Sequence, residues 1–400
     1  MNKFGFEDVM SMVQTWVRIP DVLFFQEGPG VRNTQYTTQG VKLLNVANLV
    51  DGEIDLSTSD RYISEEEAYG KYRHFLCDVG DFIVASSGIK VEYIDKKMGF
   101  IDETMLPLCM NTSTIRFKVL DINQLSIRYF MYYLKSHHFK DQLAHFITGS
   151  AQLNYGPSHL SKMTMPLIDL PEQEIIVERL DKLQSIITHR KQQLEKLDEL
   201  VKARFVEMFG DVDLTPQKSE WTTVSEIGTV VGGSTPKTSI EEYWDGDLKW
   251  ITPAELNLDT GYLYDSIRKI TKAGAESCSL QLMPINTVIL TSRAPIGKVA
   301  IAGTEFYCNQ GFKNIICKDT INPRYLYSLL LFNTDYLNSL GRGATFKEIS
   351  KAIVEKIRIP IPQIELQNQF ADFVKQVDKS KFIAEIIITT IRRVRLYDQF

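Results

Sequence analysis

The feature of this 400-residue chain that most constrains its fold is an internal repeat. Sliding the chain along itself by 194 positions superimposes Pro166 on Pro360 and Gln173 on Gln367 without a gap, and the match continues through the apolar residues that follow. Earlier in each half the match is looser: RYFMYYL at 128 is similar to RYLYSLL at 324, and VKLLNVANL at 41 to LKWITPAEL at 248. A repeat of this length predicts two copies of one structural unit.

A third matched pair of segments ends in polar residues. DFIVASSG at 81 aligns with NTVILTSR at 286, which places Ser86 and Ser87 opposite Thr291 and Ser292. Both segments read as short apolar strands because β-branched and aromatic residues dominate them. We therefore expect a polar strand end at the same place in both copies.

Each copy ends in a long helix preceded by a proline-containing bridge. The first helix lies within EQEIIVERLDKLQSIITHRKQQLEKLDELVKARFVEMFGD, and the second runs from about 364 to 397. Their apolar residues recur in alternating steps of three and four, which is the period of a coiled coil, with Arg190 as a polar exception. Gly210 predicts the end of the first helix. The expected seam residues are Ile176, Leu180, Leu183, Ile187, Leu194, Leu197, Val201, Phe370, Val374, Val377, Ile388 and Ile391.

Because the two helices share a period, we expect them to pack as an antiparallel coiled-coil pair that separates two globular domains. The fold class is then α+β, with a pseudo-two-fold internal repeat. In the alternative arrangement, each helix closes only its own domain. The predicted boundaries are 1–165 and 212–358 for the globular domains, and 166–211 and 359–400 for the helices.

Composition excludes several classes of protein. A net charge of −5 and a pI near 5.8 argue against a protein that coats nucleic acid non-specifically. One island is nevertheless basic, since residues 279–304 contain Arg293 and Lys298 but no acidic residue. The five cysteines never form a C-x-x-C pair and are expected to be small buried hydrophobes. The apolar runs are too short for a membrane span and MNKFGFEDVM lacks the apolar core of a signal peptide, so we expect a cytoplasmic protein.

No catalytic motif is complete. TSRAPIGKV at 291–299 ends in a Gly-Lys pair, but a phosphate-binding loop needs glycine where Ser292 stands and a hydroxyl where Val299 stands. There is no Asn-Pro-Pro-aromatic sequence for base methylation, and the six histidines show no metal-ligand spacing. Asp247-Leu248-Lys249 has the acid-x-lysine ending of some nucleases without a preceding Pro-Asp pair. We therefore predict no catalytic and no metal site in this chain.

Residues suited to DNA contact are easier to find. Arg, Asn and Gln side chains read base edges, whereas Lys, Ser and Thr mainly hold phosphates. The candidates in the second copy include the glycine-led loop GGSTPKT and are Ser234, Thr235, Lys237, Tyr243, Lys249, Trp250, Thr252, Ser292, Arg293, Lys298, Asn309, Gln310 and Lys313. The candidates in the first copy are Gln26, Arg32, Asn33, Gln35, Tyr36, Lys42, Asn45, Asn48, Ser86, Ser87 and Lys90.

This order of parts resembles the specificity subunits of type I restriction-modification systems. TSRAPIGKVAIA followed by NQGFKNI, with GGSTPKT and LKWITPAEL, is similar to a target-recognition domain of that family. LPEQEIIVERLDKL and LDELVKARFVEMFGD are similar to its central conserved helix. The first copy departs from the pattern with SSGIKVEY, and the terminal FIAEIIITTIRRVRLYDQF is more apolar and Arg-rich than is usual there.

The resemblance implies a non-catalytic subunit that recognises a split, asymmetric sequence in double-stranded DNA, one domain per half. It implies two methyltransferase subunits, which use S-adenosylmethionine to methylate adenine, and restriction/translocase subunits, which use ATP and magnesium. These cofactors belong to the partners, and none is expected in this chain. Two alternatives stay open from the residues themselves: a stand-alone DNA-cleaving enzyme, and a coiled-coil scaffold that binds only proteins.

Overall fold

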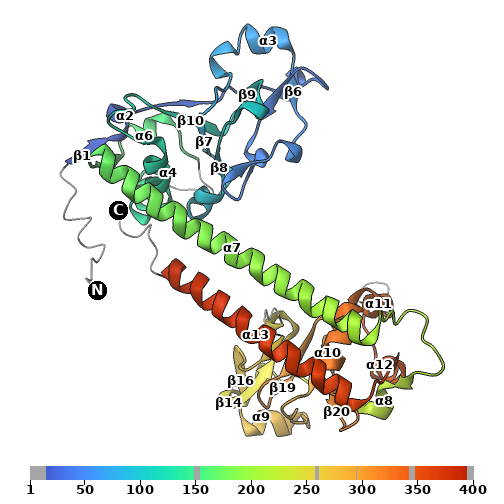
Figure 1. The fold of residues 1–400 in the computed structure, drawn as a ribbon. Helices are drawn as coiled ribbons and strands as arrows, with labels where there is room; N and C mark the ends of the chain where they lie inside the picture. Colours follow the sequence, from blue (N-terminus) through green and yellow to red (C-terminus); the bar gives the residue numbers. More distant parts are fainter. Residues whose placement is uncertain (1–14, 148–153, 257–260, 294, 342–346, 394–400) are drawn as a thin grey trace. The chain divides into compact units, whose positions relative to one another are not determined.

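The computed structural model describes residues 15–147, 154–256, 261–293, 295–341 and 347–393 (Figure 1). The chain forms two compact units, one of residues 1–189 with 387–400 and one of residues 190–386. The chain start MNKFGFEDVM, where no signal peptide is expected, and the part of the second helix expected beyond Arg393 lie outside the described residues.

The first unit is a mixed domain built on two small sheets. A four-stranded sheet has the order β2-β10-β7-β8, and a three-stranded sheet has the order β6-β3-β9. The strands of these sheets are β2 (Leu23–Glu27), β10 (Thr114–Val119), β7 (Phe82–Ala85), β8 (Met98–Phe100), β6 (Tyr62–Ile63), β3 (Val41–Leu44) and β9 (Leu108–Met110). Two further pairs are β1 (Thr15–Arg18) with β11 (Thr164–Leu167) and β4 (Leu49–Val50) with β5 (Glu53–Ile54). The helices are α2 (Ile19–Val22), α3 (Glu65–Tyr69), α4 (Ile127–Lys135), α5 (His137–Phe146), α6 (Pro157–Leu160) and α7 (Leu170–Phe209), whose second half belongs to the other unit.

The second unit repeats this plan. Its sheets have the orders β13-β20-β17-β18-β15 and β16-β14-β19, with β12 (Thr222–Thr223) paired to β21 (Arg358–Ile359). The strands are β13 (Gly228–Gly232), β20 (Lys313–Cys317), β17 (Val288–Leu290), β18 (Val299–Ala302), β15 (Tyr262–Leu263), β16 (Arg268–Ile270), β14 (Trp244–Ile251) and β19 (Tyr307–Cys308). The helices are α8 (Val224–Ile227), α9 (Lys272–Ser277), α10 (Pro323–Phe332), α11 (Thr334–Ser339), α12 (Lys351–Lys356) and α13 (Ile364–Arg393). The repeat predicted from the sequence is therefore a repeat of sheet topology as well.

Backbone hydrogen bonds correct one detail of the predicted alignment. Tyr155 N–H donates to Ser86 O, and Ile349 N–H donates to Ser292 O. Since Tyr155 and Ile349 are related by the 194-residue offset, Ser86 corresponds to Ser292 and not to Thr291. The alignment by sequence matched hydroxyl to hydroxyl, whereas the ladder of backbone bonds fixes which residue faces which side of the sheet.

The next residue pair shows the same shift. Ser87 forms a β-bridge with Asn154, and Arg293 forms one with Glu348, again a pair related by 194 positions. Ser87 therefore stands where Arg293 stands in the second unit. The two copies present a hydroxyl and a guanidinium at one equivalent position, which makes this position a difference between them.

The cores form where apolar strand faces meet the helices of the same unit. Phe82 and Phe117 of the first sheet pack against Phe130 of α4, with ring centroids 6.4 and 5.0 Å from that ring. Phe205 of α7 and Phe370 of α13 pack with Tyr325 of α10 in the core of the second unit. Burial of about 25 cal/mol per Å² of apolar surface makes these clusters the main source of stability in each unit.

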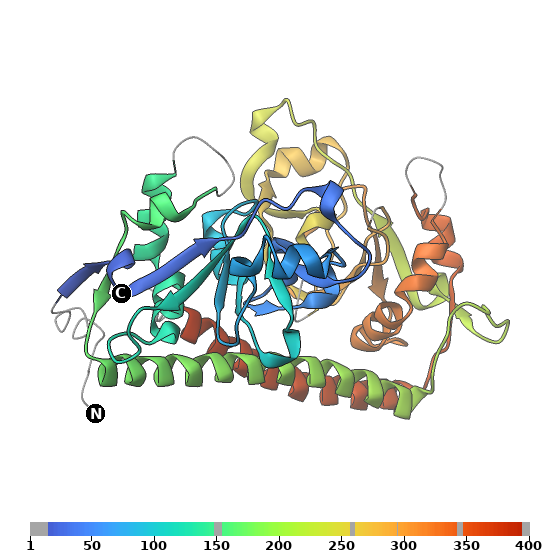
Figure 2. The ribbon, with the colours of Figure 1, turned by 90° about the horizontal axis from the view of Figure 1, so that it is seen from above.

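The long helices behave in part as expected. α7 has 40 residues and ends before Gly210, which has a φ of 80° and whose N–H donates to Val206 O, as the glycine predicts. In the second unit its C-terminal half runs antiparallel to α13, because Phe205 contacts Phe370 while Asp198 pairs with Lys381 (Figure 2). Lys381 occupies a seam place between Val377 and Ile388, and it is buried.

Only some of the expected seam residues belong to the core of a globular unit, and the others lie further along the two helices. Ile176 and Leu180 lie in the core of the first unit, and Phe370 and Val374 lie in the core of the second. Each helix thus closes its own domain over its first turns. Val377 and Ile388 are also buried, whereas the half-buried seam residues are Leu183, Ile187, Leu194, Leu197, Val201 and Ile391.

A repeated clamp fixes each domain to the start of its own helix. Gln173 is fully buried, accepts a hydrogen bond from Ser126 N–H at 2.9 Å, and donates to the carbonyls of Gln124 and Ile168 at 2.9 and 2.8 Å. In the second unit, Gln367 accepts from Asn322 N–H at 2.8 Å and donates to the carbonyls of Thr320 and Pro362 at 3.4 and 2.8 Å. One buried side chain therefore satisfies three backbone groups in each copy.

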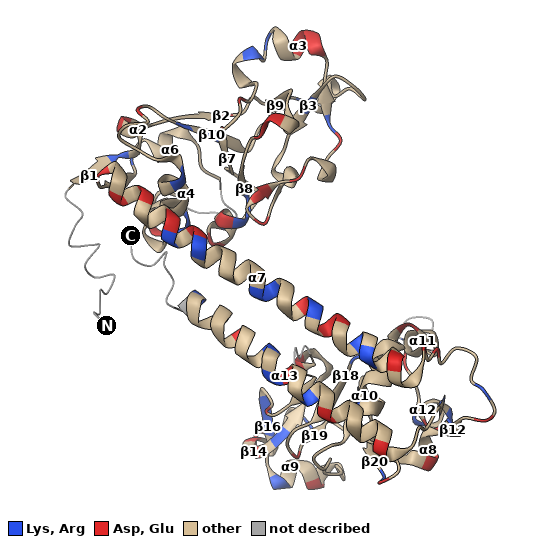
Figure 3. Cartoon of the chain, viewed as in Figure 1, with Lys and Arg blue, Asp and Glu red and all other residues tan. Residues whose placement is uncertain are grey.

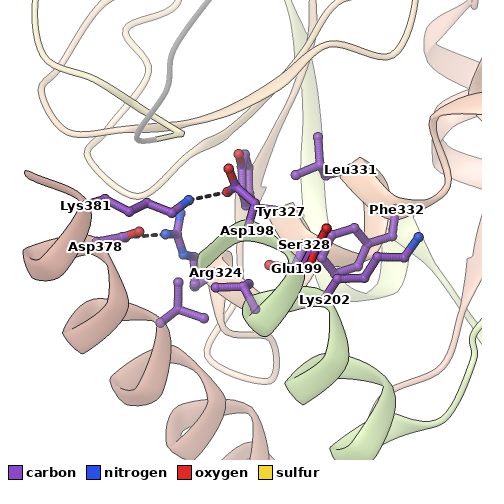
Figure 4. A pocket seen from close by; sticks show the side chains of 12 residues that line it. Asp198, Glu199, Lys202, Arg324, Tyr327, Ser328, Leu331, Phe332, Asp378 and Lys381 are labelled. Atoms are coloured by element: carbon purple, nitrogen blue, oxygen red, sulfur yellow. Dashed lines mark hydrogen bonds and ion pairs between the residues drawn. The ribbon is translucent and has the colours of Figure 1, made fainter. Parts of the chain in front are cut away.

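An arginine–aspartate pair repeats beside the glutamine. Arg128 of α4 pairs with Asp181 of α7 at 2.7 Å, and Arg324 of α10 pairs with Asp378 of α13. The second pair lines a pocket of about 340 Å³ with Asp198 and Lys381, in which the two ion pairs lie side by side (Figure 4). Burial raises the pKa of Asp378 although Arg324 acts to lower it.

Candidate nucleic-acid interface

In the second unit, the loop after β13 is held against two tryptophans. Trp250 Nε1–H donates to Ser234 O at 3.1 Å, and Trp244 Nε1–H donates to Lys237 O at 3.2 Å. A Cβ at Gly233 would lie 2.0 Å from Cys308 O, so only glycine fits this approach. The loop predicted from GGSTPKT therefore needs glycine at 233 because the strand at Cys308 packs against it. The two tryptophan hydrogen bonds hold the loop backbone in place beneath its polar side chains.

A continuous set of polar contacts runs from this loop to the strand end at 292. Thr235 Oγ1–H donates to Gln310 Oε1 at 2.7 Å. Lys313 Nζ then contacts Gln310 O at 3.4 Å, Ser292 Oγ at 3.2 Å and Glu348 Oε1 at 3.3 Å. We call Thr235, Gln310, Lys313, Arg293 and Glu348, which adjoin the buried Ser292, the second-unit polar surface.

Arg293 stands at the end of this surface. Its Nε–H donates to Glu348 Oε2 at 3.1 Å, and the side chains are 48% and 36% exposed. An ion pair this exposed contributes about 0–1 kcal/mol, so little holds the guanidinium against a competing anion. Lys313 is only 13% exposed and all three of its protons have partners, so its charge stays in place.

Several predicted residues of the second unit support the surface from below. Trp250 and Ser292 are buried, so their side chains position neighbours and do not offer a contact of their own. Thr252 caps a short helix through Glu255, and Asn309 Oδ1 accepts from Gly311 N–H. The remaining three are half-buried: Tyr243, Lys249, whose Nζ donates to Thr304 Oγ1 at 3.0 Å, and Lys298, whose main chain pairs with Thr291.

The first unit brings together a smaller group. Asn111 Nδ2–H donates to Asn45 Oδ1 at 2.8 Å and to Tyr36 Oη at 3.4 Å. Ser87 Oγ–H and Ser113 Oγ lie 2.6 Å apart at the strand end. Asn111 corresponds to Asn309, since a Cβ at Gly28 would meet Asn111 O as one at Gly233 would meet Cys308 O and Asn309 O.

Other predicted residues of the first unit are buried or make hydrogen bonds within the domain. Gln26 accepts from the buried Arg116, Asn48 and Ser86 are fully buried, and Gln35 donates to Glu67 and Tyr72. Burial acts to lower the pKa of Lys42, but hydrogen bonds to Asp60 and Tyr62 outweigh it and raise that pKa. The exposed members are Arg32, Asn33 and Lys90.

Sequence reasoning missed three charged residues near these surfaces: Glu348, Arg61 and Arg268. Glu348 was hidden because it lies far along the chain from Arg293 and follows the segment 342–346. Arg61 and Arg268 were detectable, since the offset of 207 positions that relates VKLLNVANL to LKWITPAEL also relates these two arginines.

Metal-binding clusters and membrane-spanning helices are absent from the described ranges 15–147, 154–256, 261–293, 295–341 and 347–393. No group of three or more His, Cys, Asp or Glu residues there could hold a metal ion. Within the same ranges, no helix combines the length and apolar character needed to cross a membrane. Cys77, Cys109 and Cys308 are buried, as expected of small hydrophobes, whereas Cys278 and Cys317 are partly exposed.

Two copies of a mixed domain, each followed by a long helix and each carrying polar strand ends, define a duplicated recognition scaffold. Residues 36–198 and 216–391 both match the model of the type I restriction modification DNA specificity domain, and the chain belongs to this family. The membership confirms the resemblance and the mixed, duplicated fold predicted from the sequence.

Individual relatives agree with this assignment. The chain is 41% identical over 184 residues to the type I restriction enzyme MjaIX specificity subunit of Methanocaldococcus jannaschii, a match that covers 45% of this chain and 43% of that one. It is 24% identical over 365 residues to the putative MjaX specificity subunit of the same organism, covering 85% and 80%. It is 26% identical over 232 residues to the EcoR124I/EcoR124II specificity subunit of Escherichia coli, covering 54% and 55%. The chain thus spans about half the length of two of these three relatives.

Solved structures share the fold. The S subunit of a type I restriction-modification system from M. genitalium superimposes with a TM-score of 0.56 at 15% identity, covering 96% of this chain and 95% of that one. A chain from a structure describing complex assembly and conformational transition of the type I R-M system gives a TM-score of 0.59 at the same identity and coverage. None of these comparisons supports the two alternative functions.

Proposed function

We propose that this chain is the DNA-recognition subunit of a type I restriction-modification complex and reads a bipartite, asymmetric target with one domain per half. The observation that carries the proposal is the pair of family domains with equivalent but unlike polar strand ends. Equivalent positions hold Ser87 in one unit and Arg293 in the other, and a hydroxyl and a guanidinium select different partners. Two such surfaces suit two different half-sites.

In this proposal the chain itself performs no catalysis. Its partners are double-stranded DNA, two methyltransferase subunits and restriction/translocase subunits. S-adenosylmethionine, ATP and magnesium act in those partners, and the complex works in the cytoplasm. The globular domains of residues 1–165 and 212–358 read the DNA, and the helices of residues 166–211 and 359–400 connect them.

Methylation mapping tests the proposal directly. The chain is combined with methyltransferase subunits and S-adenosylmethionine, and methylated adenines are mapped in a library of random-sequence duplexes. We expect one motif with two dissimilar defined halves separated by an undefined gap. Methylation without a motif, or cleavage of DNA by the purified chain alone with Mg²⁺, contradicts the proposal.

A further inference from the structure

One arginine outside the predicted sites occupies the same place in both units. In the first unit, β3 and β6 pair Lys42 with Tyr62, and Leu43 N–H donates to Arg61 O. In the second unit, β14 and β16 pair Lys249 with Lys269 and Trp250 with Arg268. Arg61 and Arg268 therefore hold equivalent positions, one residue before the cross-strand partner of a lysine.

Both guanidinium groups lie over aromatic rings. The Arg61 guanidinium carbon is 5.3 Å from the centre of the Tyr36 ring, and that of Arg268 is 3.8 Å from the Trp244 ring and 5.4 Å from the Trp250 ring. Tyr36 and Trp244 each directly follow a three-residue 3-10 helix, Asn33–Gln35 and Glu241–Tyr243, so the two copies supply this ring from matching places, and Trp250 of β14 adds a second ring in the second unit. Stacking fixes the plane of the guanidinium and leaves its N–H edge free to donate.

These arginines differ from Arg293 in their charge environment. Both residues are exposed, and among the described residues neither has an ion-pair partner, whereas Arg293 pairs with Glu348. On β16, Lys269 follows Arg268, and it pairs with Lys249 of β14, a strand that also carries Asp245 and Asp247, so both signs of charge lie on these two strands (Figure 3). An exposed, unpaired and oriented guanidinium is suited to bind an anionic oxygen through two N–H groups.

Arg268 also adjoins the second-unit polar surface. The rings beneath it, Trp244 and Trp250, donate to the carbonyls of Lys237 and Ser234, and Thr235 between them contacts Gln310. In the first unit, the ring beneath Arg61 belongs to Tyr36, whose hydroxyl oxygen accepts from Asn111 Nδ2–H, and Asn111 also donates to Asn45 Oδ1. Each stacked arginine thus borders the polar group of its own unit.

The identity of the two arginines indicates which part of DNA they contact. Residues that read two unlike half-sites should differ between the copies, as Ser87 and Arg293 do. A residue kept the same in both suits the part of DNA that is the same in both, namely the phosphate backbone. We propose that Arg61 and Arg268 are equivalent phosphate anchors that set each domain on its half-site. This rests on the proposed function.

The test uses the complex with methyltransferase subunits and measures binding to two duplexes of equal length, one with the mapped target and one without it. Arg61→Gln and Arg268→Gln keep the side-chain stem and remove the charge. Each should weaken binding to both duplexes by a similar factor, roughly 10-fold, and lower the slope of log K against log salt by about 1. Lys272→Ala, which removes a charge already paired with Glu276 at 3.8 Å, is the matched control and should change affinity less than about 2-fold.

The outcomes separate this inference from the proposed function. A loss confined to the target duplex assigns the arginine to base reading and overturns the anchor role, and unchanged affinity and salt slope overturn any DNA contact. If Arg268→Gln and Lys272→Ala lower the affinity for DNA equally, the loss reflects only the net charge of the domain, and the anchor role is also overturned. If the unmodified complex shows no preference between the two duplexes, the proposed function itself fails.

Discussion

The glutamine clamp allows the most quantitative prediction. Gln367→Ala removes three hydrogen bonds from a fully buried side chain and leaves the Asn322 N–H without its acceptor. Each hydrogen bond contributes about 1 kcal/mol net, and a buried group left without a partner costs about 1–3 kcal/mol more. The bond from Gln367 to Thr320 O is long, at 3.4 Å, and is expected to contribute little. We therefore expect the free energy of unfolding to fall by about 3 kcal/mol. For a unit of this size that corresponds to a fall of roughly 6–12 °C in Tm.

Calorimetric unfolding of the full chain measures this loss. Gln369→Ala, two residues along the same helix and exposed, is the control and should change stability by less than about 0.5 kcal/mol. Gln173→Ala should produce a similar loss in the first unit, because its three contacts have the same pattern. If Gln367→Ala unfolds at the same temperature as Gln369→Ala, the clamp contributes nothing and the reasoning is wrong.

Two further predictions concern buried groups. Lys381→Leu completes the apolar seam and leaves Asp198, whose side chain is 69% exposed, in contact with water, so we expect the urea midpoint of unfolding to stay the same or to rise slightly. Asp198→Ala leaves the buried Lys381 without its partner and should lower the free energy of unfolding by about 1 kcal/mol. Equal losses in the two variants would contradict this reasoning. Burial raises the pKa of the Cys77, Cys109 and Cys308 thiols to about 12, so native chain treated with iodoacetamide at pH 7 should leave these three unmodified until denaturant is added, and labelling of them before unfolding would show that they are accessible thiolates.

The sequence predicts the parts of this structure that depend on periodicity and repetition. Apolar spacing located both long helices, Gly210 marked the end of the first, and the offset of 194 residues paired the two clamp glutamines. These features are visible because each depends on residues close together in the chain or on a comparison of the chain with itself.

Features that depend on distant contacts were not predictable. From the sequence alone, Lys381 is expected to be an exposed lysine, because its partner Asp198 lies far away in the chain. Ser86 was matched to the wrong residue because hydroxyl identity is a weaker constraint than the backbone ladder. Trp250 was expected at the surface, but β16 and the loop after β13 cover it.

The central claim is that one domain reads one half of a split target, and Arg293→Ala tests it most directly. Methylation motifs are mapped for the variant and unmodified complexes under the same conditions. We expect the variant motif to be relaxed in one half, with binding to that half weakened by about 1–3 kcal/mol, while the other half stays unchanged. Relaxation of both halves, or an equal loss of affinity for unrelated DNA, contradicts the claim.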